Sequence, residues 1–222
     1  MICKPYLLIT ILCCSLGYTS SVRPNPAEDG KAVVADATET IYRAIQEQCE
    51  EIEKSPLRLH QLVEEILIPH ADFQRMAQLA LGKHWRTADD NQKIEFVIQF
   101  RHILTRTYAT AVQMASLEAI HYLPSRAGAK PNTMTVRTEV RRPGEPMVAI
   151  NYPLYQKDGN WLVYDIIVDG MSLVSNYRST FSEQIQKGGF PALIAMLEKK
   201  NQQPIVESNA DLIRRRADRA CK

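Results

Sequence analysis

Apolar residues recur at helical spacing through the first half of the chain, which predicts a series of amphipathic helices. The apolar face of the first predicted helix consists of Val33, Ala37, Ile41, Ile45, Cys49 and Ile52. Ser55-Pro56 ends this helix. Shorter patterns predict helices over 57–67 and over 72–81, and Gly82 ends the second of these.

A longer helix is predicted to follow residues 87–90, where a threonine hydroxyl for the N-cap and two acidic side chains suit a first helical turn. Its apolar positions are Ile94, Val97, Ile98, Phe100, Ile103, Leu104, Tyr108, Ala111 and Val112. This stripe is wide enough to contact more than one neighbouring element.

After about residue 116 the apolar residues alternate with a period of two, which is typical of strands. Strands are predicted over 117–123, 133–142, 147–156 and 160–168. The turn at 142–145 and the hairpin at Asp158-Gly159 are so short that they require antiparallel pairing. Helices over 174–187 and 190–200, separated by Gly188-Gly189, close the pattern. The predicted fold class is α+β, with N-terminal helices, an antiparallel sheet meander and C-terminal helices around an apolar interior.

The last predicted strand leaves the sheet through an unusually apolar segment. Residues 160–168 are apolar on both faces, and Asp169-Gly170 leads into Met171, Leu173 and Val174. Segments that leave a strand are normally polar, because they lie against water. An apolar exit beside a wide helical stripe indicates an interior that is either densely packed or holds an apolar ligand.

The composition fits a folded protein with a sizeable core. Of the 222 residues, 45% are hydrophobic and 23% are charged, which suits one domain or one domain with an appended lobe. The formal net charge of +2 is too small for a protein whose main task is nucleic-acid binding, so no nucleic-acid partner is predicted.

The N-terminal residues have the pattern of a secretory signal peptide. Lys4 precedes an apolar run over 6–16 that is too short to span a membrane, and small residues follow. Cys13 and Cys14 leave a lipoprotein anchor as the alternative, although the bulky residues before them do not suit lipoprotein processing. The predicted organisation is a signal peptide at 1–21, a linker at 22–32, the folded domain at 33–201 and a basic flexible tail at 202–222.

Removal of the signal peptide would leave two cysteines, Cys49 and Cys221. Two cysteines this far apart do not make a disulfide framework. Cys49 is therefore interpreted as a small core residue and Cys221 as a free thiol in the tail.

Residue spacing indicates no catalytic, cofactor or metal site. The histidines lack a metal-ligand spacing, and the chain has no phosphate-binding loop. Ser172 lacks the glycine that a nucleophile elbow needs two positions later and is interpreted as a helix N-cap. Asp165 and Asp169 lie four residues apart on the predicted strand, so an isomerase or hydratase that uses one of them with a tyrosine is the enzyme alternative.

Several separated segments resemble the MlaC family, also called the toluene-tolerance family. They are LIPHADF at 67–73, GKHWR at 82–86, FRHILTRTYATA at 100–111, YDIIVDGMSLVSNYRSTF at 164–181 and GGFPALIAMLEKK at 188–200. The resemblance spans about 32–201 and implies an NTF2-like part with a deep apolar pocket for the acyl chains of a phospholipid. It further implies a periplasmic carrier, not an enzyme, that ferries lipid between an outer-membrane lipoprotein complex and an inner-membrane ABC transporter.

We expect apolar side chains from the helices, the sheet and the strand exit to form the wall of that pocket. The expected lipid-binding residues are Phe73, Met76, Val97, Phe100, Leu104, Tyr108, Val136, Val148, Ile150, Tyr152, Val163, Ile166, Val168, Met171, Leu173 and Tyr177. The same pattern of apolar residues leaves two alternatives open. The cargo could be a hopanoid or another apolar lipid, and the protein could be an adaptor whose cavity is vestigial.

An exported copy of this protein is expected to begin within or just after residues 17–21, because signal peptidase cuts after small residues. N-terminal sequencing and an intact mass of the protein from the periplasm test this expectation. A mass that retains residues 1–16, or an acylated cysteine at position 13 or 14, would contradict it.

Overall fold

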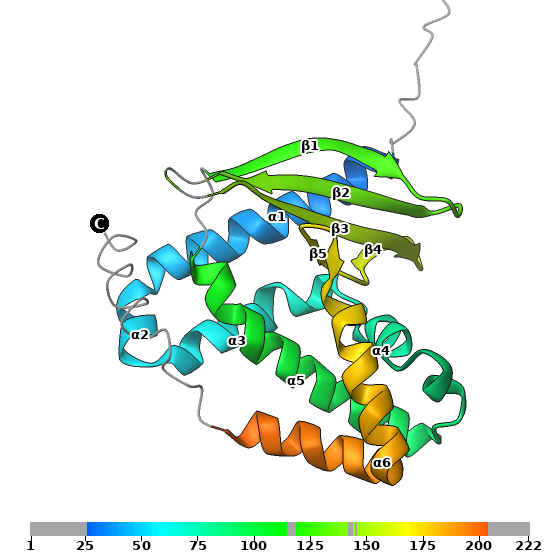
Figure 1. The fold of residues 1–222 in the computed structure, drawn as a ribbon. Helices are drawn as coiled ribbons and strands as arrows, with labels where there is room; N and C mark the ends of the chain where they lie inside the picture. The colour runs from blue at the N-terminus through cyan, green and yellow to red at the C-terminus, as the bar shows by residue number, and fades with distance from the viewer. Residues whose placement is uncertain (1–25, 115–118, 142–143, 145, 204–222) are drawn as a thin grey trace, which may run out of the picture.

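In the computed structural model, which describes residues 26–114, 119–141, 144 and 146–203, helices cover one face of an antiparallel sheet (Figure 1). The helices are α1 (Pro26–Glu47), α2 (Cys49–Lys54), α3 (Pro56–Ile66), α4 (Phe73–Leu81), α5 (Asp90–Met114) and α6 (Leu173–Gln202), with 3-10 turns η1 (Ile68–His70) and η2 (Gly82–Arg86). The strands are β1 (Ile120–Ala127), β2 (Thr133–Val140), β3 (Val148–Lys157), β4 (Asn160–Val163), β5 (Ile167–Val168) and β6 (Met171–Ser172). The predicted α+β class is confirmed. The predicted signal peptide and nearly all of the predicted tail lie outside the described residues.

Three element boundaries differ from the sequence-based expectation. Helix α1 already begins at Pro26, inside the range 22–32 that was expected to be a linker, and proline suits the first turn of a helix. The chain breaks at Gln48, so the expected first helix is two helices. Asp89, not Thr87, caps α5: its carboxylate accepts the Gln92 N–H at 2.9 Å while Gln92 Oε1 accepts the Asp89 N–H at 3.2 Å, which is a capping box.

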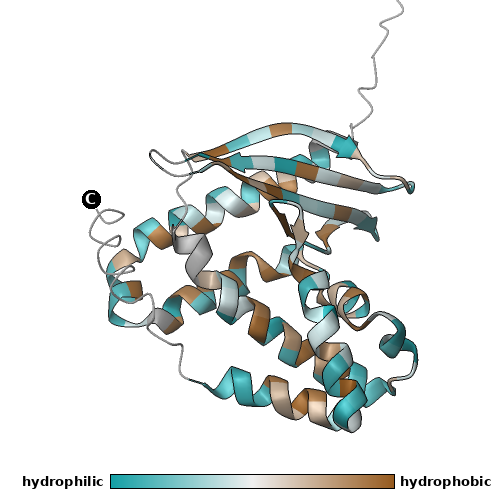
Figure 2. Cartoon of the chain, in the orientation of Figure 1, coloured by the Kyte–Doolittle hydropathy of each residue, from teal (hydrophilic) through white to brown (hydrophobic). Residues whose placement is uncertain are grey.

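The C-terminal helices agree with the expectation. Ser172 is the N-cap of α6, and its side chain accepts the Ser175 N–H at 2.9 Å. Gly188 and Gly189 have non-helical backbone angles and divide α6 into two segments, with Gly189 at a φ of 69° that favours glycine. The second segment lies under α5 in Figure 1, and its last turns are hydrophilic in Figure 2.

Cys49 is disulfide-bonded, which corrects its interpretation as a plain core residue. The other four cysteines, Cys3, Cys13, Cys14 and Cys221, lie outside the described residues.

The buried side chains form three clusters. The helical cluster contains buried residues of α4, α5 and α6. Phe96 and Phe100 of α5 pack there against Phe181 of α6, with ring centroids 5.3–5.5 Å apart. A second cluster joins α1, α2 and α3 around Ile41 and Leu62. A third cluster packs Val34 of α1 against the inner face of the sheet. The wide stripe of α5 contacts α3, α4 and α6, which explains why it is broader than one neighbour needs.

The strand predicted over 160–168 is interrupted by a β-bulge. Val163 pairs with Leu154 and Val168 pairs with Ile150, so between the two pairs β3 advances by four residues and its partner by five. Side chains along a strand point alternately to the two faces of the sheet, and one extra residue exchanges the face to which the following side chains point. The bulge explains why the segment is apolar at both odd and even positions.

Asp165 lies in this bulge and bonds to the start of α6. Its side chain is 8% exposed and accepts the Ile166 N–H at 2.8 Å, the Ser172 hydroxyl at 2.5 Å and the Val174 N–H at 3.3 Å. Asp169 instead lies in a two-residue turn with Gly170, at φ values of 49° and 83°. This turn reverses the chain, so β5 and β6 form a hairpin before α6 begins at Leu173.

Asp72 connects the start of α4 to the sheet. Its N–H donates to the Val163 carbonyl at 2.9 Å, and its carboxylate accepts the Arg75 N–H at 2.8 Å and the Tyr155 hydroxyl. Lys157 lies 3.7 Å away. Burial opposes ionisation of Asp72, but these hydrogen bonds and nearby cations outweigh it and lower its pKa below 3.8.

Asp165→Ala is expected to lower the free energy of unfolding by on the order of 3 kcal/mol, because it leaves buried donors without an acceptor. Urea unfolding measures the change. The control is Asp169→Asn, at an exposed turn position where asparagine tolerates a positive φ. Equal stability of the two variants would contradict the role of Asp165.

Asp72→Asn is expected to reduce stability by on the order of 1 kcal/mol near neutral pH, since the charged hydrogen bonds become neutral ones. Because the pKa of Asp72 is lowered on folding, the advantage of the wild type is complete above about pH 4 and disappears as the pH falls through the lowered value. Urea unfolding of the wild type and of Asp72→Asn at several pH values through this range tests the direction of the pH dependence. A difference that does not depend on pH would count against the ionised carboxylate.

Candidate functional site

A cavity of about 320 Å³, here called the main cavity, lies between the inner face of the sheet and the helices. Its lining residues are Val33, Val34, Ala37, Thr38, Ile41, Tyr42, Val63, Leu67, Ile68, His70, Ala71, Phe73, Met76, Leu104, Thr105, Tyr108, Ala109, Ile120, Val140, Ile150, Tyr152, Val163, Ile166, Val168, Leu173 and Val174. They come from α1, α3, η1, α4, α5, the sheet and the start of α6, so members of all three buried clusters border the same space.

Local structure explains how these elements reach the cavity. The period of α1 places Val34, Ala37 and Ile41 on one face, which is directed at the cavity. The bulge places Val163, Ile166 and Val168 on the cavity side of the sheet.

The wall of the main cavity is predominantly apolar. Among the described residues that line it, none is an aspartate, glutamate, lysine or arginine. The Thr38 hydroxyl donates to the Val34 carbonyl at 2.6 Å, and the Thr105 hydroxyl donates to Glu64 at 3.3 Å. Burial raises the pKa of Tyr108 and of Tyr152 to about 12, so both phenols stay neutral at physiological pH. Such a wall suits hydrocarbon. His70 is the one histidine among the described lining residues.

Many of the residues expected in the pocket wall border the main cavity. They are Phe73, Met76, Leu104, Tyr108, Ile150, Tyr152, Val163, Ile166, Val168 and Leu173. Their contact with lipid stays a prediction.

The remaining expected residues lie elsewhere. Phe100 and Tyr177 pack edge to face in the helical cluster, with ring centroids 5.4 Å apart. Val136 is fully buried in the cluster that α1 forms with the sheet. Val148 is half-buried at the start of β3, opposite Val140. Met171 is 61% exposed on the edge strand β6. Val97 borders a different cavity.

The lining residues that sequence reasoning missed come mainly from α1 and from the segment 67–71 around η1. The apolar period of α1 was visible, but a period identifies a buried face without telling which neighbour the face meets. Ala71 is positioned by a parallel bridge to Val163, a long-range contact that has no local signal.

The enzyme alternative finds no support in this geometry. Neither Asp165 nor Asp169 borders a described cavity, and the expected continuous strand that would put them on one face is broken by the bulge. No group of three or more potential metal ligands is present within the described residues. The helices in those same ranges include none that is long and apolar enough to cross a membrane.

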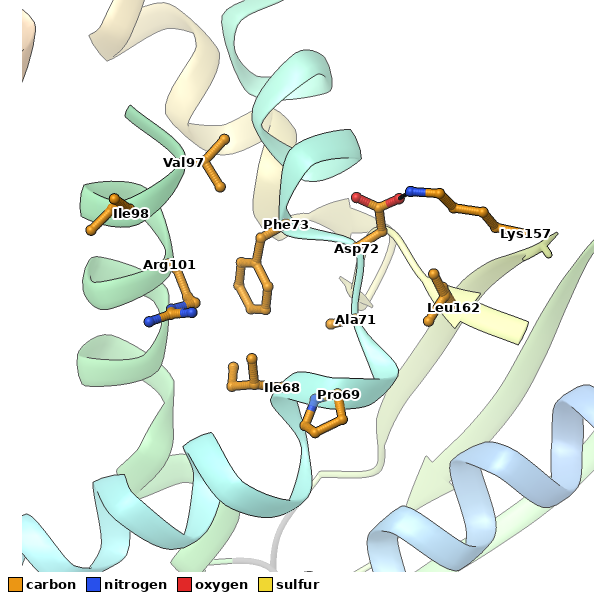
Figure 3. A pocket seen from close by; sticks show the side chains of 10 residues that line it. All are labelled: Ile68, Pro69, Ala71, Asp72, Phe73, Val97, Ile98, Arg101, Lys157 and Leu162. Atoms are coloured by element: carbon orange, nitrogen blue, oxygen red, sulfur yellow. Dashed lines mark ion pairs between the residues drawn. The ribbon is translucent and has the colours of Figure 1, made fainter. Parts of the chain in front are cut away.

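A second cavity of about 340 Å³ adjoins the main cavity (Figure 3). It is lined by Ile68, Pro69, Ala71, Asp72, Phe73, Val97, Ile98, Arg101, Lys157 and Leu162. The two cavities share Ile68, Ala71 and Phe73, so these side chains form the partition between them.

Comparison with known proteins agrees with the fold and the cavity. A family model described as MlaC protein matches residues 35–199. The intermembrane phospholipid transport system binding protein MlaC of Haemophilus influenzae is 21% identical over 177 residues, which cover 78% of this chain and 83% of that protein. A phospholipid-binding protein from Ralstonia solanacearum, solved in complex with a phospholipid, is 32% identical with a TM-score of 0.71, covering 79% of this chain and 98% of the other.

The matched range includes the sheet, nearly all of the helices and every residue that lines the two cavities except Val33 and Val34. On this evidence the chain belongs to the MlaC family.

Proposed function

We propose that this protein is a periplasmic phospholipid carrier that holds acyl chains in the main cavity and moves the lipid without chemical change. The observation that carries the proposal is the predominantly apolar wall to which all three buried clusters contribute. Burying a methylene gains about 0.8 kcal/mol, so an acyl chain left in water costs on the order of 10 kcal/mol. A soluble carrier has to replace that loss with apolar contacts, and this wall supplies them.

The relatives support the choice of a phospholipid as cargo. The Ralstonia solanacearum structure contains a phospholipid, and the name of the Haemophilus influenzae relative places it in an intermembrane phospholipid transport system. A hopanoid or another apolar lipid is the alternative cargo, and the mass of the bound molecule distinguishes it from a phospholipid.

Delivery requires partners at both ends of the route. We propose an outer-membrane lipoprotein complex and an inner-membrane ABC transporter, as the resemblance to the family implies. The predicted signal peptide agrees with a route through the periplasm. Net direction would then come from the partners, because the carrier binds lipid without a built-in energy source.

Val168→Glu is expected to lower the amount of bound lipid by at least about tenfold, because it places a charge in the apolar wall. Native mass spectrometry of the purified protein measures both the occupancy and the mass of the lipid. Circular dichroism of the same sample reports whether the fold persists.

Met171→Glu is the matched control. Met171 pairs directly with Val168 across the β5–β6 hairpin but is 61% exposed and borders neither cavity. We expect Met171→Glu to retain lipid like the wild type. Wild-type protein that neither co-purifies with lipid nor takes it up from vesicles would refute the carrier function, and equal lipid loss in both variants would refute the assignment of the wall.

A further inference from the structure

The second cavity has no role in a carrier that uses the main cavity alone. Seven of its ten lining side chains are apolar, and three of its residues also border the main cavity. The two spaces therefore share part of their lining.

Phe73 is the largest side chain in the partition. It occupies the first position of α4 and is half-buried at the edge of the helical cluster. Figure 3 shows its ring between Val97 and Arg101 on one side and Ala71 and Leu162 on the other. A turn of this ring towards either side would connect the two cavities without moving a helix.

The rim of the second cavity carries charges of both signs. Arg101 Nε lies 3.6 Å from Glu64, and Lys157 lies 3.7 Å from Asp72. Arg101 Nε makes no hydrogen bond within the described residues, so these charges do not by themselves select between hydrocarbon and an anionic headgroup. The apolar side chains that make up most of the lining carry the assignment to hydrocarbon.

Size points the same way. Sites for drug-sized ligands span roughly 300 to 1,000 Å³. The main cavity, at about 320 Å³, is at the lower end of that range, whereas a diacyl lipid has more apolar atoms than such ligands. Connection to the second cavity, at about 340 Å³, would roughly double the space.

We propose that the second cavity is a side branch for the terminal part of an acyl chain, and that Phe73 is the gate that sets the chain length accepted. The proposal rests on the carrier function above. It assigns Ile98, which borders the second cavity and not the main one, to the wall of the branch.

The test is a competition between phosphatidylglycerol with myristoyl chains and phosphatidylglycerol with stearoyl chains, offered together in mixed vesicles. Native mass spectrometry of the protein recovered from the vesicles gives the ratio of the two bound lipids. Phe73→Ala is expected to raise the ratio of stearoyl to myristoyl lipid by about fourfold for each additional methylene that becomes buried, the factor that about 0.8 kcal/mol gives.

Ile98→Trp tests the branch from the opposite wall. Ile98 is 39% exposed, so a larger side chain there fills the branch without disturbing the buried core. We expect the ratio to fall by about fourfold or more while binding of myristoyl lipid alone stays within about twofold. Ile94→Trp is the matched control, one turn away on α5, 60% exposed and outside both cavities, and should behave like the wild type.

Lipid binding with an unchanged ratio in Phe73→Ala, or an Ile98→Trp variant that matches Ile94→Trp, would overturn the branch while leaving the carrier function intact. Wild-type protein that binds neither lipid would overturn the carrier function and with it the branch. Opposite shifts of the two variants, with the control unmoved, support the proposal.

Discussion

An apolar interior that side chains do not fill costs a folded protein stability, and the architecture of this chain depends on keeping such an interior open. Protein cores normally pack to the density of organic crystals, and cavities lower stability in proportion to their volume. Here the buried side chains gather in three separate clusters, and the hollow lies where they meet.

Polar contacts join the elements that border the hollow to one another. Asp72 joins α4 to β4 through its backbone and to Tyr155 through its side chain. Asp165 joins the bulge to the start of α6. Both carboxylates are buried, and buried carboxylates persist only when hydrogen bonds satisfy them. Of the two aspartates that suggested acid–base chemistry in the sequence, Asp165 therefore has a structural explanation.

Much of the fold was predictable because its signals are local. Helical and strand periods, the hairpin at Asp158-Gly159, the cap at Ser172 and the break at Gly188-Gly189 all act within a few residues of chain. The hairpin at Asp169-Gly170 carried the same local signal but was missed, because the apolar residues on both sides made the segment look continuous. The segments that resemble the MlaC family could likewise be recognised from the sequence alone.

The sequence by itself determined which faces are buried and the class of the fold, and from the family resemblance the kind of ligand to expect. Only the tertiary structure decided which buried residues border a cavity and which are plain core. Leu104 and Phe100 lie on the same stripe of α5, yet one lines the main cavity and the other lies in the aromatic cluster. The spacing of apolar residues along a helix indicates which face of the helix is buried. Whether a buried side chain borders a cavity depends on the residues across from it, and those residues are distant in sequence.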